Sequence, residues 1–287
     1  MLKKILITGG SGQLANCFNK LKDNFPKYDF IFKTSKELDI TNPENIETIL
    51  EEEKPDFCIN TAAYTAVDLA EKESNKAFAV NAKGVGCLAE LCKEYGVCFI
   101  HISTDYVFDG ETSLPYSEDD FTNPLGIYGQ SKREGEVLAM EKNPKSIIIR
   151  TSWLYSEFNK NFVKTMLSLF KQKKELNIVN DQFGQPTNAN DLANAVMQII
   201  EKGAKTSGIF HFSNYPETTW YEFASKIKDF SGSNITLKPI PTEQYPTPAK
   251  RPKRSTFCLE KIEQIYGIEL IHWENSLEDC IAECNTR

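Results

Sequence analysis

The chain has 287 residues, with 33 lysines and arginines against 40 aspartates and glutamates, and a formal net charge of −7. This length fits one large domain or two smaller ones, and it can bury a core without the help of disulfides or a metal. The acidic balance argues against a nucleic-acid partner, because a phosphate backbone requires a basic surface.

We expect a cytoplasmic protein without a membrane partner. The sequence contains no run of 18 apolar residues, and residues 1–8 lead directly into a glycine turn, unlike a signal peptide. The eight cysteines include no C-x-x-C pair, and with three histidines no zinc-ligand spacing occurs. We therefore predict thiols in a reducing compartment and no metal site.

The first half of the chain alternates short apolar runs with amphipathic stretches. We predict strands at residues 4–8, 28–33, 56–59, 97–102 and 146–150, and helices at residues 14–21, 43–53, 74–95 and 128–141. Asn42 is the expected N-cap of the second helix. Strands separated by helices predict right-handed βαβ units, and therefore a Rossmann-type, doubly wound parallel sheet of the α/β class.

After about residue 150 the alternation becomes less regular. We predict helices at 161–170, 190–201 and 220–230, a strand at 208–212, and an extended proline-rich loop over 239–252. These elements suggest a Rossmann domain over residues 1–152, to which residues 176–212 return, and a smaller C-terminal α/β substrate-binding domain mainly over 153–287. A ligand is expected between the two, beyond the carboxyl ends of the strands.

A glycine-rich turn follows the first strand, where residues 8–15 read TGGSGQLA. Gly9 and Gly12 would let the backbone turn tightly and approach a pyrophosphate at the start of the first helix, and Ala15 is small enough for close packing. The turn therefore predicts a dinucleotide cofactor. An ordinary strand-to-helix turn is the alternative.

The end of the second strand favours NADPH over NADH. NAD-selective sites usually carry an acidic residue about 20 residues after the glycine turn, whereas here residues 32–36, at the end of the second strand, read FKTSK, with no carboxylate until Glu37. Lys33, Thr34, Ser35 and Lys36 could instead receive a 2′-phosphate. The alternative is that the two lysines are solvated surface charges, so NADH stays open as a cofactor.

Three residues form the strongest candidate for catalysis. Tyr128 and Lys132 lie four residues apart on a predicted helix and therefore share one face. A phenol with a pKa of about 10 exchanges protons poorly at neutral pH unless a cation favours the phenolate, and Lys132 would supply that cation. Thr104, after the fourth strand, would share the substrate oxygen with Tyr128.

These motifs resemble the extended short-chain dehydrogenases/reductases and, within them, the dTDP-4-dehydrorhamnose reductase family. The resemblance covers nearly the whole chain. It rests on NTAAYTAVD at 60–68, STDYVFDG at 103–110, YGQSK at 128–132, RTSWLY at 150–155, NDQFGQPT at 180–187 and YPTPAKRP at 245–252. The last three strings are more specific than the glycine turn.

The resemblance implies NADPH-dependent reduction of the C4 keto group of dTDP-4-dehydro-L-rhamnose, with Thr104, Tyr128 and Lys132 as the catalytic triad and Tyr128 as the proton donor. The implied cofactor-binding residues are Gly9, Ser11, Gly12, Gln13, Leu14, Thr34, Asp39, Ile40, Ala62, Ala63, Tyr64, Asn81, Tyr128 and Lys132. The implied substrate-binding residues are Val67, Thr104, Asp105, Tyr128, Trp153 and Arg251. Alternatively, Trp153 is a core anchor and Asp105 caps a turn.

The sequence also departs from part of the family. Some members bridge a dimer through Mg²⁺ with two glutamates, whereas the matching positions here are Cys17 and Asn190, which are not anionic oxygen ligands. We therefore predict no Mg²⁺-bridged dimer, while a homodimer of another kind stays open. Two other functions also stay open: a non-catalytic NADP-binding regulatory subunit, and a nucleotide-sugar 4-ketoreductase or epimerase acting on another sugar.

Overall fold

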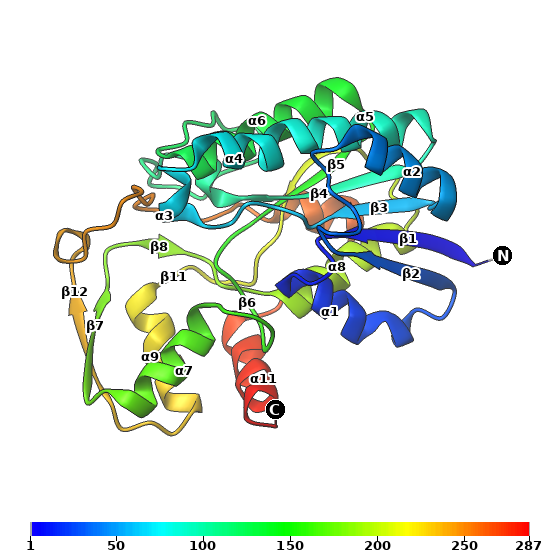
Figure 1. Cartoon of the computed structure of the whole chain (residues 1–287). Coiled ribbons are helices and arrows are strands. Elements are labelled where there is room, and N and C mark those ends of the chain that lie inside the picture. The colour runs from blue at the N-terminus through cyan, green and yellow to red at the C-terminus, as the bar shows by residue number, and fades with distance from the viewer. Residues whose placement is uncertain (1, 287) are drawn as a thin grey trace.

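A computed structural model describes residues 2–286, and a six-stranded parallel sheet lies at the centre of its larger part (Figure 1). The strands are β1 (Lys3–Thr8), β2 (Tyr28–Lys33), β3 (Phe57–Asn60), β4 (Cys98–Thr104), β5 (Ile147–Thr151) and β10 (Gly208–His211). Their order across the sheet is β10-β5-β4-β3-β1-β2. This doubly wound order confirms the predicted fold class, and it places the switch point between β1 and β3.

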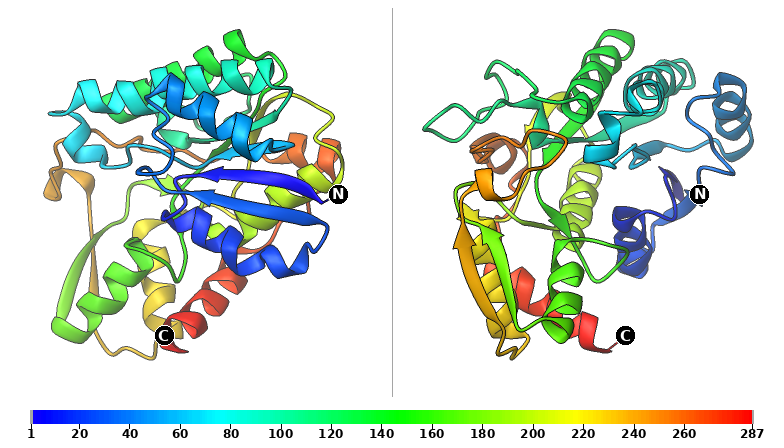
Figure 2. Two further views of the ribbon diagram at one scale, coloured as in Figure 1. Left: turned by 45° about the vertical axis from the view of Figure 1, so that its right-hand side comes forward. Right: turned by 60° about the vertical axis from the view of Figure 1, so that its left-hand side comes forward.

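Helices cover both faces of this sheet (Figure 2). One face carries α1 (Gln13–Leu21), α8 (Ala189–Glu201) and α10 (Glu260–Tyr266), and the other carries α2 (Pro43–Glu53), α5 (Val85–Glu94) and α6 (Ile127–Lys142). Because both faces are covered, the central strands are continuous apolar runs, and every residue of β5 is buried. Asn42 caps α2 as predicted, since its side chain accepts from the backbone N–H of Asn45.

The helix predicted over 74–95 is one helical run with an irregular centre. It begins as α4 (Ser74–Phe78), continues as the π-helical segment η2 (Ala79–Gly84) and ends as α5. A π segment widens the helix by one residue and often marks a functional position. The short helix α3 (Val67–Ala70) precedes this run, and the 3-10 turns η1 (Lys22–Asn24) and η3 (Asp105–Val107) follow α1 and β4.

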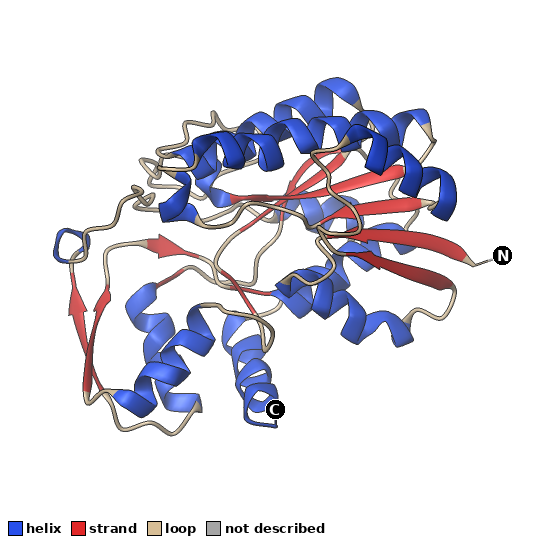
Figure 3. Cartoon of the chain, in the orientation of Figure 1, coloured by secondary structure: helices blue, strands red, loops and turns tan. Residues whose placement is uncertain are grey.

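A smaller unit lies on the side of the sheet that carries α1 (Figure 3). Its core joins α7 (Phe162–Gln172), α9 (Trp220–Phe230) and α11 (Trp273–Thr286) with the parallel pair β7 (Glu175–Val179) and β12 (Thr236–Ile240). Two short pairs complete the strands: β6 (Leu154–Tyr155) with β9 (Thr187–Asn188), and β8 (Phe183–Gly184) with β11 (Thr218–Thr219). No helix within residues 2–286 is long and apolar enough to cross a membrane.

Two predicted segments differ from the structure. The loop expected over 239–252 begins inside β12, where Pro239 lies opposite Ile178 of β7, and it contains the turn η4 (Thr242–Gln244). A proline is tolerated there because β12 is an edge strand. Within 176–212, α8 and β10 join the central sheet, whereas β7 pairs with β12 in the smaller unit.

Candidate active site

A cavity of about 770 Å³ opens at the carboxyl end of the central sheet, beside the switch point. Five parts of the chain form most of its lining: the glycine-rich turn after β1, residues 35–40 after β2, the loop after β3, the end of β4 together with α6, and the segment between β5 and α7. The volume is typical of cofactor and substrate sites. Parallel strands therefore bring residues from distant parts of the sequence to one place.

The glycine-rich turn depends on Gly9. This residue has a φ of +63°, and a Cβ on it would lie 2.9 Å from the backbone nitrogen of Ala62. Only glycine combines that backbone conformation with such a close approach to the loop after β3. The turn and that loop therefore form one continuous wall at the start of α1.

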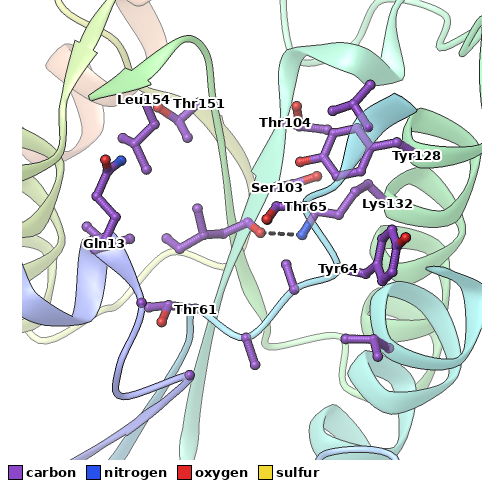
Figure 4. Close-up of a pocket in the computed structure, with 18 of the residues that line it drawn as sticks. Gln13, Thr61, Tyr64, Thr65, Ser103, Thr104, Tyr128, Lys132, Thr151 and Leu154 are labelled. Carbon is purple, nitrogen blue, oxygen red and sulfur yellow. Dashed lines mark hydrogen bonds between the residues drawn. The ribbon is translucent and has the colours of Figure 1, made fainter. Parts of the chain in front are cut away.

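The three predicted catalytic residues lie together at the opposite wall (Figure 4). Thr104 ends β4, and Tyr128 and Lys132 reach the cavity from successive turns of α6. Lys132 is 2% exposed and Thr104 is 6% exposed, while Tyr128 is half-buried and faces the cavity. The predicted i, i+4 spacing therefore places the phenol and the amine on one face of the helix.

The electrostatics of Tyr128 differ from the sequence-based expectation. Burial raises the pKa of Tyr128 to about 12; the Thr104 hydroxyl lowers it and Asp105 raises it further. Lys132 does not lower it, because its Nζ is directed elsewhere and donates to the carbonyl oxygen of Ile102 at 2.6 Å. The phenol of this ligand-free site is therefore in its protonated form at neutral pH.

Burial also shifts the pKa of Lys132 toward neutral pH. It lowers the pKa of Lys132 to about 8, and Glu136, one turn along α6, acts in the opposite direction. At neutral pH most of the lysine is still protonated, but a small rise in pH neutralises it. The lysine is therefore close to its own titration point.

Asp105 follows Thr104 and is buried beside it. Its Oδ1 accepts from the Thr104 hydroxyl at 3.0 Å, and its Oδ2 accepts from the Ser255 hydroxyl at 2.6 Å. Burial raises the pKa of Asp105 to about 6, although both hydroxyls act to lower it. Asp105 lines the cavity and connects the end of β4 to the C-terminal segment.

Trp153 has a position in both the cavity and a hydrophobic core. It lines the cavity, and its ring stacks on Trp220 of α9 with centroids 3.6 Å apart and planes 10° apart. Its φ of +46° is unusual for a residue with a side chain. The indole of Trp153 can therefore anchor the core and face a sugar in the cavity at the same time, so the two sequence-based interpretations do not exclude each other.

Most of the predicted binding residues line the cavity. They are Gly9, Ser11, Gly12, Gln13, Leu14, Asp39, Ile40, Ala62, Ala63, Tyr64, Val67, Thr104, Asp105, Tyr128, Lys132 and Trp153. Thr34, Asn81 and Arg251 lie outside the lining that the described residues form. Thr34 is turned away because its hydroxyl donates to the Glu37 carboxylate at 2.7 Å.

Asn81 supports the site from behind. It lies in η2, where its Oδ1 accepts from the backbone nitrogen of Tyr64 at 2.8 Å and its Nδ2 donates to the Ser131 hydroxyl at 3.0 Å. The fully buried amide thus joins the loop after β3 to α6. That Asn81 lies near the cofactor stays a prediction; in the structure its side chain bonds to the protein.

Arg251 is held by a carboxylate of α3. Its NH1 and NH2 donate to the two carboxylate oxygens of Asp68 at 2.7 Å and 2.9 Å. The same carboxylate accepts from the backbone nitrogen of Ala249 at 3.2 Å, and Arg251 keeps the pKa of Asp68 below its usual value. A phosphate that binds this guanidinium would either use its remaining N–H donors or compete with Asp68 for it.

Two residues that line the cavity just before α7, Asn159 and Lys160, were not predicted from the sequence. Among the described residues of the lining, Lys132 and Lys160 carry the only positive charges. Lys160 is exposed, and its neighbour Asn159 donates from Nδ2 to the carbonyl oxygen of Ser11 at 3.1 Å. No motif marks these two residues. The remaining lining residues not predicted are Leu38, Thr61, Thr65, Val80, Ile102, Ser103, Tyr106, Thr151, Ser152 and Leu154.

The four residues considered for binding a 2′-phosphate differ in their access to the cavity and in their ion pairs. Ser35 lines the cavity. Lys33 forms an ion pair with Glu53 at 2.7 Å, so its charge is already compensated, whereas Lys36 is exposed. Ser35 and Lys36 are therefore the better candidates of the four.

The positions considered for a metal bridge are occupied by other interactions. Cys17 is buried in α1, and Asn190 donates from Nδ2 to the Glu157 carboxylate at 2.9 Å. Within residues 2–286, no group of three or more His, Cys, Asp or Glu side chains is arranged to hold a metal ion.

Comparison with known proteins gives consistent matches over the full chain. The family model described as "RmlD substrate binding domain" matches residues 3–286. The dTDP-4-dehydrorhamnose reductase of Aggregatibacter actinomycetemcomitans is 43% identical, over 98% of this chain and 99% of that protein.

Two crystal structures also match closely, and both are of proteins named dTDP-4-dehydrorhamnose reductase. The one from Clostridium acetobutylicum has a TM-score of 0.93 and 41% identity, covering 97% of this chain and 98% of that one. The one from Bacillus anthracis, solved in complex with NADP, has a TM-score of 0.93 and 37% identity, covering 99% and 100%.

Proposed function

Because this chain belongs to the RmlD substrate binding domain family, whose relatives are dTDP-4-dehydrorhamnose reductases, we propose that it reduces the C4 keto group of dTDP-4-dehydro-L-rhamnose to dTDP-L-rhamnose with NADPH. The protein is an oxidoreductase. The observation that carries the substrate proposal is the convergence of Thr104, Tyr128 and Lys132 on a cavity whose opposite wall is the glycine-rich turn.

The residues of the cavity fit a phosphorylated dinucleotide. Gly9 lets the turn pass close to the backbone of Ala62 at the start of α1, where backbone N–H groups attract a pyrophosphate. Ser35 and Lys160 lie along the same wall and suit negatively charged phosphates. When bound, NADPH would supply the hydride that the carbonyl carbon accepts.

Tyr128 has the properties of a proton donor for this reduction. Its raised pKa of about 12 keeps the phenol protonated at neutral pH, so that a proton is available to the carbonyl oxygen as negative charge develops there. Lys132, four residues along α6, would stabilise the resulting phenolate when its own amine is protonated.

Thr104 would act as the second hydroxyl at the carbonyl oxygen. In the ligand-free site it donates to Asp105, so it must turn from that carboxylate toward the substrate before it can polarise the carbonyl. Val67, Asp105 and Trp153 lie nearby in the lining and would contact the sugar. We assign the cofactor to the unit formed around the central sheet and the sugar mainly to the C-terminal unit.

Three further properties belong to this proposal. We place the reaction in the cytoplasm, where reduced thiols are stable. We expect no nucleic-acid partner, given the net charge of −7. If the chain forms a homodimer, we expect it to form without Mg²⁺, because Cys17 and Asn190 occupy the positions of the bridging glutamates.

The proposal is tested by following NADPH consumption after adding dTDP-4-dehydro-L-rhamnose, with NADH and a UDP-linked 4-keto sugar as comparison reactants. We expect a higher kcat/KM with NADPH and with the dTDP sugar. Tight NADPH binding without turnover would support a regulatory subunit instead. Faster turnover of the other sugar would identify a different nucleotide-sugar reductase.

A further inference from the structure

A row of polar side chains crosses the interior of the central sheet. Thr8 of β1 lies opposite Asn60 of β3, and Asn60 lies opposite His101 of β4. All three residues are 0% exposed. Since neighbours in register project to the same face, the three side chains form a line from the glycine-rich turn toward α6.

Each member of this row is hydrogen-bonded to the next. The Thr8 hydroxyl donates to Asn60 Oδ1 at 2.6 Å, and Asn60 Nδ2 lies 3.0 Å from His101 Nδ1. His101 Nε2 lies 3.2 Å from the Nζ of Lys132. At the other end, the backbone nitrogen of Ala62 donates to Thr8 Oγ1 at 3.2 Å. The row thus joins the proposed cofactor wall to the proposed catalytic lysine.

The hydrogen-bond directions follow from the fixed donor at the start of the row. The Thr8 hydroxyl accepts from the N–H of Ala62, and Asn60 Oδ1 is the acceptor that lies within reach of its own hydrogen among the described residues. Asn60 then presents its NH₂ group to His101 Nδ1, which must be the unprotonated ring nitrogen. A neutral ring consequently carries its hydrogen on Nε2, facing Lys132.

This order of donors fits the uncharged form of Lys132, which becomes the main form above its pKa of about 8. An ammonium group has no lone pair and would oppose the Nε2–H, whereas a neutral amine accepts it and still donates to the Ile102 carbonyl. With a protonated lysine, the ring hydrogen must move to Nδ1 and the Asn60 amide must turn over. The Thr8 hydroxyl hydrogen would then have no acceptor among residues 2–286.

We propose that His101 is a positioning residue for Lys132, which holds its Nζ beside the Ile102 carbonyl and, through the Asn60–Thr8 row, favours its uncharged form. This proposal depends on the proposed function only in the turnover assay, because the protonation of Lys132 can be measured without substrate. The protonation state of the proposed catalytic lysine would then depend on His101, Asn60 and Thr8, which do not line the cavity.

The groups around Lys132 agree with this assignment. Glu136 faces it from its own helix and favours its charge, whereas burial and the neutral imidazole favour its loss. Tyr128 lies on the preceding turn, and Asp105 follows β4 on the same side of the cavity. Burial and the nearby lysine keep the pKa of His101 well below its usual value, so the ring is neutral in this arrangement.

The experiment measures the protonation of Lys132 directly, by titrating its ¹³Cε NMR signal, which is assigned by its loss in Lys132→Met. His101→Phe removes the donor and keeps a ring of similar size, and Thr8→Val breaks the row without contacting Lys132. We expect the titration midpoint to rise by about one pH unit in His101→Phe, the equivalent of one lost hydrogen bond, and by less in Thr8→Val. His101→Gln, which retains an N–H donor, should restore most of the wild-type midpoint.

The matched control is His211→Gln, since His211 is also buried in the central sheet but binds Arg150. Its midpoint should equal that of the wild type. The proposal is wrong if the variants that fold, among His101→Phe and Thr8→Val, titrate with the wild-type midpoint. Because the signal is read without substrate, this result is independent of whether the enzyme reduces the proposed sugar; the alkaline limb of kcat in turnover assays should shift in parallel.

Discussion

The indole of Trp153 lies against Gly184, so closely that a Cβ on Gly184 would be 2.6 Å from Cε2 of the indole. The ring is also stacked on Trp220, and its backbone has a positive φ. Residues from β8, α9 and the end of β5 therefore fix one aromatic side chain in the wall of the cavity. This explains why a glycine occurs within the string at 180–187.

Gly184→Ala should displace Trp153 from the cavity wall. We expect kcat/KM for the nucleotide sugar to fall by up to about 100-fold, the typical effect of a misplacement of about 1 Å, while the affinity for NADPH is unchanged. Steady-state kinetics with each reactant varied will measure this. Gly96→Ala is the control for a general loss of stability, because its φ of +70° also disfavours a side chain but its added methyl meets no atom within 4 Å and lies away from Trp153. An equal loss in both variants would contradict the packing argument.

Tyr128→Phe should remove the proton donor and leave the cavity intact. We expect kcat to fall roughly 10²–10⁴-fold, with little change in NADPH binding. Turnover and cofactor titration will measure the two effects separately. Tyr95→Phe removes a phenol that does not line the cavity, and should behave as the wild type. An unchanged kcat in Tyr128→Phe would exclude the assigned role.

Asp105 should make the protein less stable as the pH rises from about 4 to about 6. The folded form binds this proton with a pKa of about 6, above the ordinary 3.8, so between these values it holds more protons than the unfolded form. The resulting cost at neutral pH is roughly 3 kcal/mol. Asp105→Asn should remove this dependence. Urea unfolding at pH 4 and pH 7 tests it, with the exposed Asp119→Asn as control.

Lys160→Ala should weaken cofactor binding. The side chain lies at the rim of the cavity, beside the glycine-rich turn, and an exposed charge pair of this kind contributes up to about 1 kcal/mol. We expect the Kd for NADPH to rise about two- to fivefold, and the effect to shrink at high salt. Fluorescence titration measures the Kd. Lys173→Ala, outside the lining, should have no effect.

Adding Mg²⁺ or a chelator should leave the oligomeric state unchanged. Cys17 is buried and Asn190 is bonded to Glu157, so neither offers an anionic oxygen to a bridging ion. Mass measurement in solution under both conditions tests this. A dimer that dissociates on chelation would show that other residues hold the metal.

Local sequence patterns were sufficient where neighbours along the chain determine the structure. The spacing of Tyr128 and Lys132 and the glycines after β1 predicted the two walls of the cavity, and Asn42 predicted the start of α2. Side-chain partners far apart in sequence could not be predicted. Asp68 binds Arg251 from 183 residues away, and no pattern in the sequence pairs these two residues.

Electrostatic expectations failed for a related reason. The spacing alone suggested that Lys132 would lower the pKa of Tyr128, but burial dominates both groups, and burial is a property of the folded chain. Lys160 was not predicted because no motif contains it, and long-range bonds from Asn159 to Ser11 and from Asn161 to Gln13 hold its segment at the cavity.

The hydrogen bond from Ser255 to Asp105 also bears on the biosynthesis of the enzyme. Asp105 lies in the first half of the chain, but one of its carboxylate oxygens is bound by a residue that the ribosome adds 150 positions later. While the chain is still being made, the central strands can pair, yet the carboxylate beside Thr104 lacks this partner. The nascent protein therefore acquires this arrangement of its active site only after residue 255 has been synthesised.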